Sequence, residues 1–355
     1  MVAEGKGLLA MDESNPTCNK RFAKAEISQN EEARRSYREL ILTTPGLSEF
    51  ISGVILYDET IRQSKKDGTA FIKIITDAGI IPGIKVDIGA KDLAGHPSEK
   101  ITEGLDGLRE RLTQYKKMGA RFAKWRAVIN IGEKMPSKGC IEANAHALAR
   151  YASLCQETDL VPIVEPEVLM NGEHTLERCS EVTEEVLRDV FNHLYIQNVK
   201  LEGMILKPNM TLPGLDCPKQ ETIDEVAYAT VRCLLRVVPA AVPGIAFLSG
   251  GQSGQLASAR LNAMNTRGKF KLPWELSFSF ARAIQQPALE IWRGEEAHVL
   301  AAQEALYHRA KCNGAARRGE YNGAMEQFEP NNTDKTQAKA NLLNSLGNSK
   351  MGVSP

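Results

Sequence analysis

The segment LEGMILKPN, residues 201–209, is a short apolar run that ends in Lys207 and Pro208. Such a run favours a buried strand, because the strands of a parallel sheet are covered on both faces. Together with seven similar runs, it predicts eight buried strands. The other seven runs are KGLLAMD (6–12), ISGVILYDE (51–59), IIPGIKVD (80–87), RFAKWRAVI (121–129), LVPIVEPEV (160–168), GIAFLSGGQ (244–252) and ELSFSFARA (275–283).

Helical patterns separate these runs, for example at residues 141–157 and 184–197. Eight strand–helix units in succession are typical of a closed (β/α)8 barrel, a TIM barrel, which is a single α/β domain. An open, doubly wound sheet is the alternative, but no G-x-G-x-x-G motif follows the first strand. We expect the barrel to occupy residues 1–320, with a final helix at 301–321 and a polar, loosely packed tail at 321–355.

The composition excludes several classes of partner. The 44 basic residues balance the 44 acidic ones, so no net charge would attract nucleic acid or a membrane surface. The apolar runs are too short to cross a bilayer. Seven scattered cysteines without a C-x-x-C pair indicate reduced thiols, and the N-terminus does not resemble a signal peptide. We therefore expect a cytoplasmic protein, with the plastid stroma as the alternative if a transit peptide has been removed.

Charged residues gather near the C-terminal ends of the predicted strands. In a barrel these ends meet at one mouth, and charged groups in buried strands are costly unless they are paired or functional. The two glutamates of the E-P-E segment are two positions apart, so both should face the barrel interior. We therefore expect an active site at the mouth. Its candidate residues on the strands are Asp12, Lys85, Asp87, Lys124, Arg126, Glu165, Glu167, Lys207 and Arg282.

Lys207 is the candidate nucleophile. A lysine amine attacks carbonyl groups when burial or a neighbouring cation lowers its pKa, and Lys124 could be that cation. Two carboxylates in unequal surroundings, such as Glu165 and Glu167, can divide acid and base roles, with Asp12 as a further base. The alternative is that each lysine only forms a structural ion pair with a glutamate.

Two groups of residues favour phosphate binding. Backbone N–H groups of Ser249, Gly250 and Gly251 follow the seventh strand, the usual phosphate position of a barrel, and Ser279 and Arg282 end the eighth. A glycine pair alone is only weak support, since glycines are common in turns. A second anion site could form from Ser14, Thr17, Lys20, Lys85 and Arg126. Two such sites would suit a substrate that is phosphorylated at both ends.

Metal catalysis is disfavoured by the histidines. None of the six ends a predicted strand, and no H-E-x-x-H spacing occurs. The sequence also contains no cofactor fingerprint. A carbonyl substrate would then be activated as an iminium on lysine, without metal or cofactor.

The sequence resembles the class I fructose-1,6-bisphosphate aldolases, in particular their plant-type and bacterial members. The resemblance runs from GKGLLAMDES to about Tyr321 and rests on the motifs GVILYDET, GIKVD, FAKWR, VPIVEPE, LEGMILKPNM, FLSGGQS and SFSFARA. It implies reversible cleavage of fructose 1,6-bisphosphate to dihydroxyacetone phosphate and glyceraldehyde 3-phosphate. It also implies sugar phosphates as the partners, a homotetramer, and a role in glycolysis, gluconeogenesis or the Calvin cycle.

The resemblance also implies roles for single residues. Lys207 matches the Schiff-base lysine, Glu165 the acid/base for imine formation, and Asp12 the base for the C4 hydroxyl. Lys124 matches an electrostatic helper and Glu167 a second carboxylate. The positions around the C1 phosphate are Ser249, Gly250 and Arg282, and those near the C6 phosphate are Ser14, Thr17, Lys85 and Arg126.

Three features depart from the family pattern. Members usually have a helix before the first motif, whereas this sequence opens at that motif. Phe280 replaces a tyrosine found in many members, and Ala281 is shared with plant-type members. Eukaryotic members end in a tyrosine that assists enamine protonation, whereas this sequence ends in GVSP. The proton donor for that step is therefore left unassigned.

Two alternatives stay open at this point. Another Schiff-base barrel, such as a transaldolase or an aldolase for a sugar with one phosphate, would use the same lysine. A catalytically silent scaffold would need damage at the lysine or carboxylate positions, and no such damage occurs.

Overall fold

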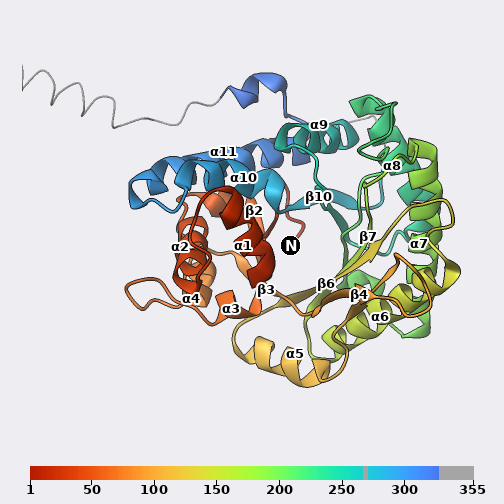
Figure 1. The fold of residues 1–355 in the computed structure, drawn as a ribbon, viewed down its shortest axis with the longest axis horizontal. Coiled ribbons are helices and arrows are strands. Elements are labelled where there is room, and N and C mark those ends of the chain that lie inside the picture. Colours follow the sequence, from red (N-terminus) through yellow and green to blue (C-terminus); the bar gives the residue numbers. More distant parts are fainter. Residues whose placement is uncertain (267–270, 328–355) are drawn as a thin grey trace, which may run out of the picture.

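The computed structural model describes residues 1–266 and 271–327, and its centre is a closed barrel of eight parallel strands (Figure 1). The strands follow the order β1-β10-β9-β8-β7-β6-β3-β2 around the barrel. They are β1 (Gly7–Ala10), β2 (Ile51–Leu56), β3 (Ile81–Lys85), β6 (Phe122–Ile129), β7 (Val161–Val168), β8 (Ile205–Leu206), β9 (Gly244–Phe247) and β10 (Glu275–Phe280). The predicted barrel and its eight strands are confirmed, and the open-sheet alternative is wrong.

Helices surround the barrel and cover its outer face (Figure 1). Side-chain caps fix where several begin: Ser137 accepts a bond from Cys140 N, and Thr222 forms a capping box with Glu225. The helices are α1 (Asn15–Lys24), α2 (Glu31–Leu42), α3 (Asp58–Ile61), α4 (Phe71–Asp77), α5 (Leu108–Lys117), α6 (Lys138–Glu157), α7 (Leu176–Ile196), α8 (Ile223–Val237), α9 (Gly254–Asn265), α10 (Arg282–Trp292) and α11 (Val299–Arg317). Short 3-10 turns add η1 (Leu47–Glu49), η2 (Leu201–Gly203), η3 (Glu296–His298) and η4 (Gly323–Glu326).

An antiparallel hairpin, which the sequence did not predict, lies between β3 and β6. It consists of β4 (Gly89–Asp92) and β5 (Lys100–Glu103). Thr102 joins it to the barrel, because its hydroxyl donates to the carbonyl of Arg126 at 2.8 Å. The hairpin escaped prediction because its strands are mostly polar and partly exposed, so no buried apolar run marks them.

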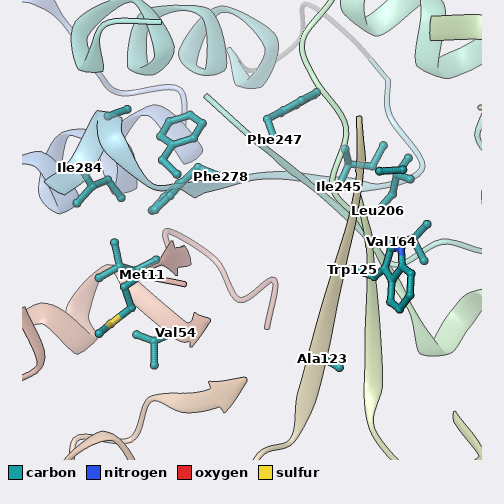
Figure 2. Packing of buried hydrophobic residues seen from close by; sticks show 14 of the residues in the cluster. Met11, Val54, Ala123, Trp125, Val164, Leu206, Ile245, Phe247, Phe278 and Ile284 are labelled. Carbon is teal, nitrogen blue, oxygen red and sulfur yellow. The ribbon is translucent and has the colours of Figure 1, made fainter. Parts of the chain in front are cut away.

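Strand alternation separates the two sides of the barrel wall. Outward-facing residues pack against the helices, and Figure 2 shows part of this layer, where Trp125, Val164 and Leu206 come from neighbouring strands in register. Inward-facing residues at the lower end form a separate apolar cluster. The buried members of that cluster are Leu8, Ala10, Ile55, Phe122, Ile163, Ile205 and Ala246.

The same alternation carries the charged residues into the mouth. Two positions beyond inward-facing Ala10, Phe122, Ile163 and Ile205 stand Asp12, Lys124, Glu165 and Lys207, in that order. The barrel interior is thus apolar at the bottom and charged at the top.

Phe122 fills the bottom of the barrel where Gly83 leaves room for it. A Cβ atom on Gly83 would lie 2.1 Å from Cε2 of the Phe122 ring. The absence of a side chain at this position in β3 lets the ring enter the interior.

The predicted final helix is confirmed as α11. After it, η4 packs on the barrel domain through Glu326, which Arg309 and Tyr321 both contact. The predicted tail at 321–355 is therefore ordered in its first residues, and 328–355 lies outside the described residues. No helix in the described part of the chain is both long and apolar enough to cross a membrane.

Candidate active site

A cleft of about 1670 Å³ opens where the C-terminal ends of the strands meet. Every site residue that the sequence predicted lines this one cleft, so the structure brings together residues from seven of the barrel strands and their loops. They are Asp12, Lys124, Glu165, Glu167 and Lys207, with Ser14, Thr17, Lys85, Arg126, Ser249, Gly250, Gly251, Ser279 and Arg282.

Glu165 lies between two lysines at the centre of the cleft. Its Oε1 is 3.2 Å from Lys207 Nζ, and its Oε2 is 3.2 Å from Lys124 Nζ. Lys124 Nζ also lies 2.6 Å from Asp12 Oδ2. Four charged side chains, on β6 and β7 or just after β1 and β8, thus form one continuous chain of ion pairs, and none is more than 8% exposed.

The protonation states in this chain follow from its geometry. Burial would raise the pKa of Asp12, but attraction by Lys124 and Lys207 outweighs it and lowers that pKa to about 2. Burial would also raise the pKa of Glu165, and the same two lysines lower it. Burial would lower the pKa of Lys124, yet Asp12 and Glu165 raise it well above the ordinary lysine value. Both carboxylates are therefore ionised at neutral pH, and Lys124 is a cation.

One oxygen of Glu165 remains open to further hydrogen bonding. Its Oε2 is buried and within ion-pair distance of Lys124, but it makes no hydrogen bond with any described residue. A carboxylate oxygen beside an amine and with a free lone pair can exchange a proton with a bound ligand.

Two more ion pairs flank the central chain. Glu167 pairs with the Nε of Arg126, and Lys85 Nζ lies 2.6 Å from Asp87 Oδ1. Asp87 also accepts backbone N–H bonds from Gly89 and Arg126. Glu165 and Glu167 both face the cleft, as their spacing predicted, but they have different partners.

The loop after β9 approaches the start of α10. Gly250 and Gly251 have φ of 57° and 91°, a left-handed conformation that favours glycine. A Cβ on Gly251 would lie 3.3 Å from Arg282 Nη2, so the guanidinium and the loop backbone are close. On β10, the buried hydroxyl of Ser279 has no hydrogen-bond partner among the described residues. These groups together present donors to an anion.

A second set of donors lies at the start of α1. Ser14 is the N-cap residue of α1, and its hydroxyl is 3.0 Å from that of Thr17. Lys20, one turn further along, also lines the cleft. Lys85 lines the same cleft, so these residues offer it hydroxyl and ammonium donors.

Sequence reasoning missed an ion-pair cluster beside Asp12. The neighbouring Glu13 carboxylate lies 2.5 Å from Arg21 and 3.0 Å from Arg38. Burial would raise the pKa of Glu13, but Arg38 and Arg21 lower it. Gln285 of α10 also donates to Glu13. The acidic pair at 12–13 was the only available signal, because arginines on two helices cannot be matched to it by spacing.

Within residues 1–266 and 271–327, no group of three or more His, Cys, Asp or Glu side chains is arranged to hold a metal ion. All seven cysteines are free and buried.

Comparisons with known proteins agree on one family. The family described as fructose-bisphosphate aldolase class-I matches residues 1–341. A probable fructose-bisphosphate aldolase class 1 from Xanthomonas campestris is 59% identical over 324 residues, which cover 91% of this chain and 96% of that protein. The cytosolic fructose-bisphosphate aldolase 6 of Arabidopsis thaliana is 52% identical, over 90% of this chain and 88% of its own length.

A solved structure extends the similarity to the fold. It is a fructose-bisphosphate aldolase from Plasmodium falciparum in a ternary complex with TRAP and a small molecule inhibitor. The TM-score is 0.89 at 47% identity, and the match covers 91% of this chain and 93% of that one.

Proposed function

The chain belongs to the class I fructose-bisphosphate aldolase family, and on that premise we propose that Lys207 is the amine that forms the Schiff base. The reaction of the family is reversible cleavage of fructose 1,6-bisphosphate to dihydroxyacetone phosphate and glyceraldehyde 3-phosphate, and it is the reaction of this chain.

The first step forms the iminium. Lys207 Nζ attacks the C2 ketone of the open-chain substrate, and a C–N bond forms while the carbonyl oxygen becomes a hydroxyl. Glu165, 3.2 Å from that nitrogen, passes one amine proton to the carbonyl oxygen, and a second proton, taken up from solvent through Glu165, converts the hydroxyl to the water that leaves. The resulting cation beside Glu165 is stabilised by the carboxylate.

The second step breaks the C3–C4 bond. Asp12 takes the proton of the C4 hydroxyl, C4 becomes an aldehyde, and the bonding pair moves toward the C2 iminium to give an enamine. Glyceraldehyde 3-phosphate leaves. Because Asp12 is ionised and paired with Lys124, the substrate hydroxyl must replace part of that contact.

The last step returns the enzyme to its starting state. The enamine takes up a proton at C3, water adds to the iminium, and dihydroxyacetone phosphate is released from Lys207. Lys124 stays protonated and stabilises negative charge on Asp12 and Glu165. Glu167 holds Arg126 at the edge of the site.

Two anion sites hold the substrate ends. The C1 phosphate binds to the backbone of Ser249, Gly250 and Gly251, together with Ser279 and Arg282. The C6 phosphate binds at a second place in the cleft, near Ser14, Thr17, Lys85 and Arg126. What supports this assignment is that both sets of donors line the same cleft as Lys207.

The observation that carries the mechanism is the contact between Lys207 Nζ and Glu165 Oε1 inside that cleft. The test is incubation with dihydroxyacetone phosphate and borohydride, followed by peptide mapping. We expect a stable adduct on Lys207 and none on Lys124, and loss of activity in Lys207→Ala. Full activity in Lys207→Ala would refute the assignment.

We also propose that the enzyme needs no metal, is cytoplasmic and forms a homotetramer. The buried free cysteines and the cytosolic Arabidopsis relative support the location. Exposed apolar residues on the neighbouring helices α7 and α8 support assembly, since exposed apolar surface favours association. They are Tyr195, Ile196, Tyr228 and Leu235, each at least 50% exposed. Native mass spectrometry of the protein and of Tyr228→Asp tests this: a monomeric native protein would contradict it.

A further inference from the structure

A buried arginine lies behind the loop that follows β9. Arg260, on α9, is 7% exposed, and its Nε has no hydrogen-bond partner among the described residues. No ion pair within residues 1–266 and 271–327 includes its guanidinium. Burial lowers the pKa of Arg260, but a guanidinium remains protonated in proteins. Arg260 is therefore a buried cation without a carboxylate partner in the described part of the chain.

An uncompensated charge of this kind is costly. Moving a cation out of water is unfavourable unless an anion or a set of hydrogen bonds replaces the water. The other buried arginines of the site region have carboxylate partners: Arg21 and Arg38 pair with Glu13, and Arg309 pairs with Glu326. Arg260 has no such carboxylate partner among the described residues. A bound anionic ligand could therefore be the group that compensates its charge.

The contacts of Arg260 lead to the loop. Helical side chains tilt toward the helix N-terminus, and α9 begins just after the loop. The Nη1 of Arg260 donates to Gln252 Oε1 at 2.8 Å. Gln252 in turn donates to the Ser249 carbonyl from both its backbone N and its Nε2, each at 3.0 Å. Arg260 thus holds Gln252, and Gln252 closes the turn that contains Gly250 and Gly251.

Arg260 itself does not line the cleft, whereas Gln252 and the loop do. Its charge reaches a ligand only through the loop. Because Arg260 is buried, its charge is screened less than it would be in water and acts over a longer distance.

We propose that Arg260 is a positioning residue for the phosphate loop, and that its buried charge is compensated when a dianionic phosphate binds on the other side of that loop. The inference rests on the proposed function, because it takes the loop to be the C1 phosphate site. Arg260 would then be a charged residue that does not contact the substrate. Its charge would strengthen the binding of any ligand whose phosphate lies at this loop.

A structural role and a charge role of Arg260 predict different changes in the melting temperature of the ligand-free protein. If Arg260 were only a strut for Gln252, then Arg260→Met would destabilise the ligand-free protein. If its charge awaits a phosphate, the same change removes an unpaired buried cation, so the ligand-free protein melts at an unchanged or higher temperature while phosphate ligands bind more weakly.

The experiment compares Arg260→Met and Arg260→Gln with the native protein. The glutamine variant keeps a donor for Gln252 but has no charge. Arg282→Met reports on the phosphate site itself, and Arg109→Met is the control, because Arg109 is an exposed arginine paired with Glu157 on the outer helices. The readouts are the melting temperature without ligand and the half-saturating dihydroxyacetone phosphate concentration for borohydride trapping on Lys207.

We expect both Arg260 variants to raise the half-saturating concentration by roughly tenfold. The trapping yield at saturation and the half-saturating concentration of glyceraldehyde 3-phosphate in the condensation direction should stay native. Native affinity in Arg260→Met, restoration of native affinity in Arg260→Gln, or a lowered melting temperature in Arg260→Met would each overturn the proposal. Native affinity in Arg282→Met would instead refute the proposed C1 phosphate site.

Discussion

Lys124 Nζ lies 2.6 Å from Asp12 Oδ2, and this contact accounts for much of the lowering of the pKa of Asp12 to about 2. Because the folded-state pKa is depressed, the pair stabilises the protein fully above the ordinary aspartate value of about 4. That contribution is lost as the pH falls through about 2.

Lys124→Met should therefore move the acid side of the kcat/KM profile to higher pH. Burial raises the pKa of Asp12 once its cation is gone, so a larger fraction of Asp12 is protonated and cannot act as a base. We expect kcat to fall by about 100-fold or more. The free energy of unfolding should fall by about 3 kcal/mol, because one partner of a buried pair is removed. Steady-state kinetics across pH and urea unfolding measure these effects.

Lys116→Met is the matched control. Lys116 pairs with the exposed Asp159 on the barrel surface, so its loss should leave the profile and the stability close to native. An acid limb that stays in place in Lys124→Met would mean that the Lys124–Asp12 contact does not set the protonation of the catalytic base.

The strands and the mouth of the barrel could be predicted because burial leaves a direct mark on sequence. Buried parallel strands are short apolar runs, and the charged residues Lys124 and Lys207 stand out within them. The ends of the strands could not be predicted. LEGMILKPN contains only two strand residues, β8, partly because Pro208 has no N–H group to continue the ladder.

Side chains that act through other residues could not be predicted from the sequence, for a different reason. Arg260 sits in a helix, where an arginine normally indicates a solvent-facing position, and nothing in its spacing shows that it reaches back to Gln252. The pairing of Glu13 with Arg38 likewise depends on how α2 packs on the barrel.

Lys85→Met should separate the two phosphate sites. If Lys85 serves the C6 phosphate, its loss should raise the KM for fructose 1,6-bisphosphate by about tenfold or more, since a charge-assisted hydrogen bond is removed. The KM for fructose 1-phosphate should hardly change. In this variant Asp87 still accepts hydrogen bonds from the N–H groups of Gly89 and Arg126. The segment after β3 should therefore keep its conformation. Lys73→Met on the exposed face of α4 is the control, and equal losses on both substrates would contradict the assignment.

Chelation should not affect the reaction. In the proposed mechanism the iminium on Lys207 accepts the electron pair that a metal ion would otherwise stabilise. Dialysis against EDTA should leave kcat/KM at its starting value for fructose 1,6-bisphosphate. A loss of activity that a divalent metal ion restores would refute the metal-independent route, while the borohydride adduct would show whether Lys207 still reacts.

Gly83→Ala should destabilise the barrel without touching the mouth. The new Cβ would lie 2.1 Å from the Phe122 ring, so the ring or the β3 backbone must move in a closely packed interior. We expect a loss of about 2–3 kcal/mol in the free energy of unfolding, measured by urea titration. Gly323→Ala is the control, because a Cβ there meets no atom within 4 Å. The double variant Gly83→Ala/Phe122→Leu should recover part of the loss, since the smaller side chain vacates the clash. If the single variant were as stable as the control, Phe122 could not be the residue that fills the bottom of the barrel. Other side chains would then have to form the apolar layer below the charged mouth.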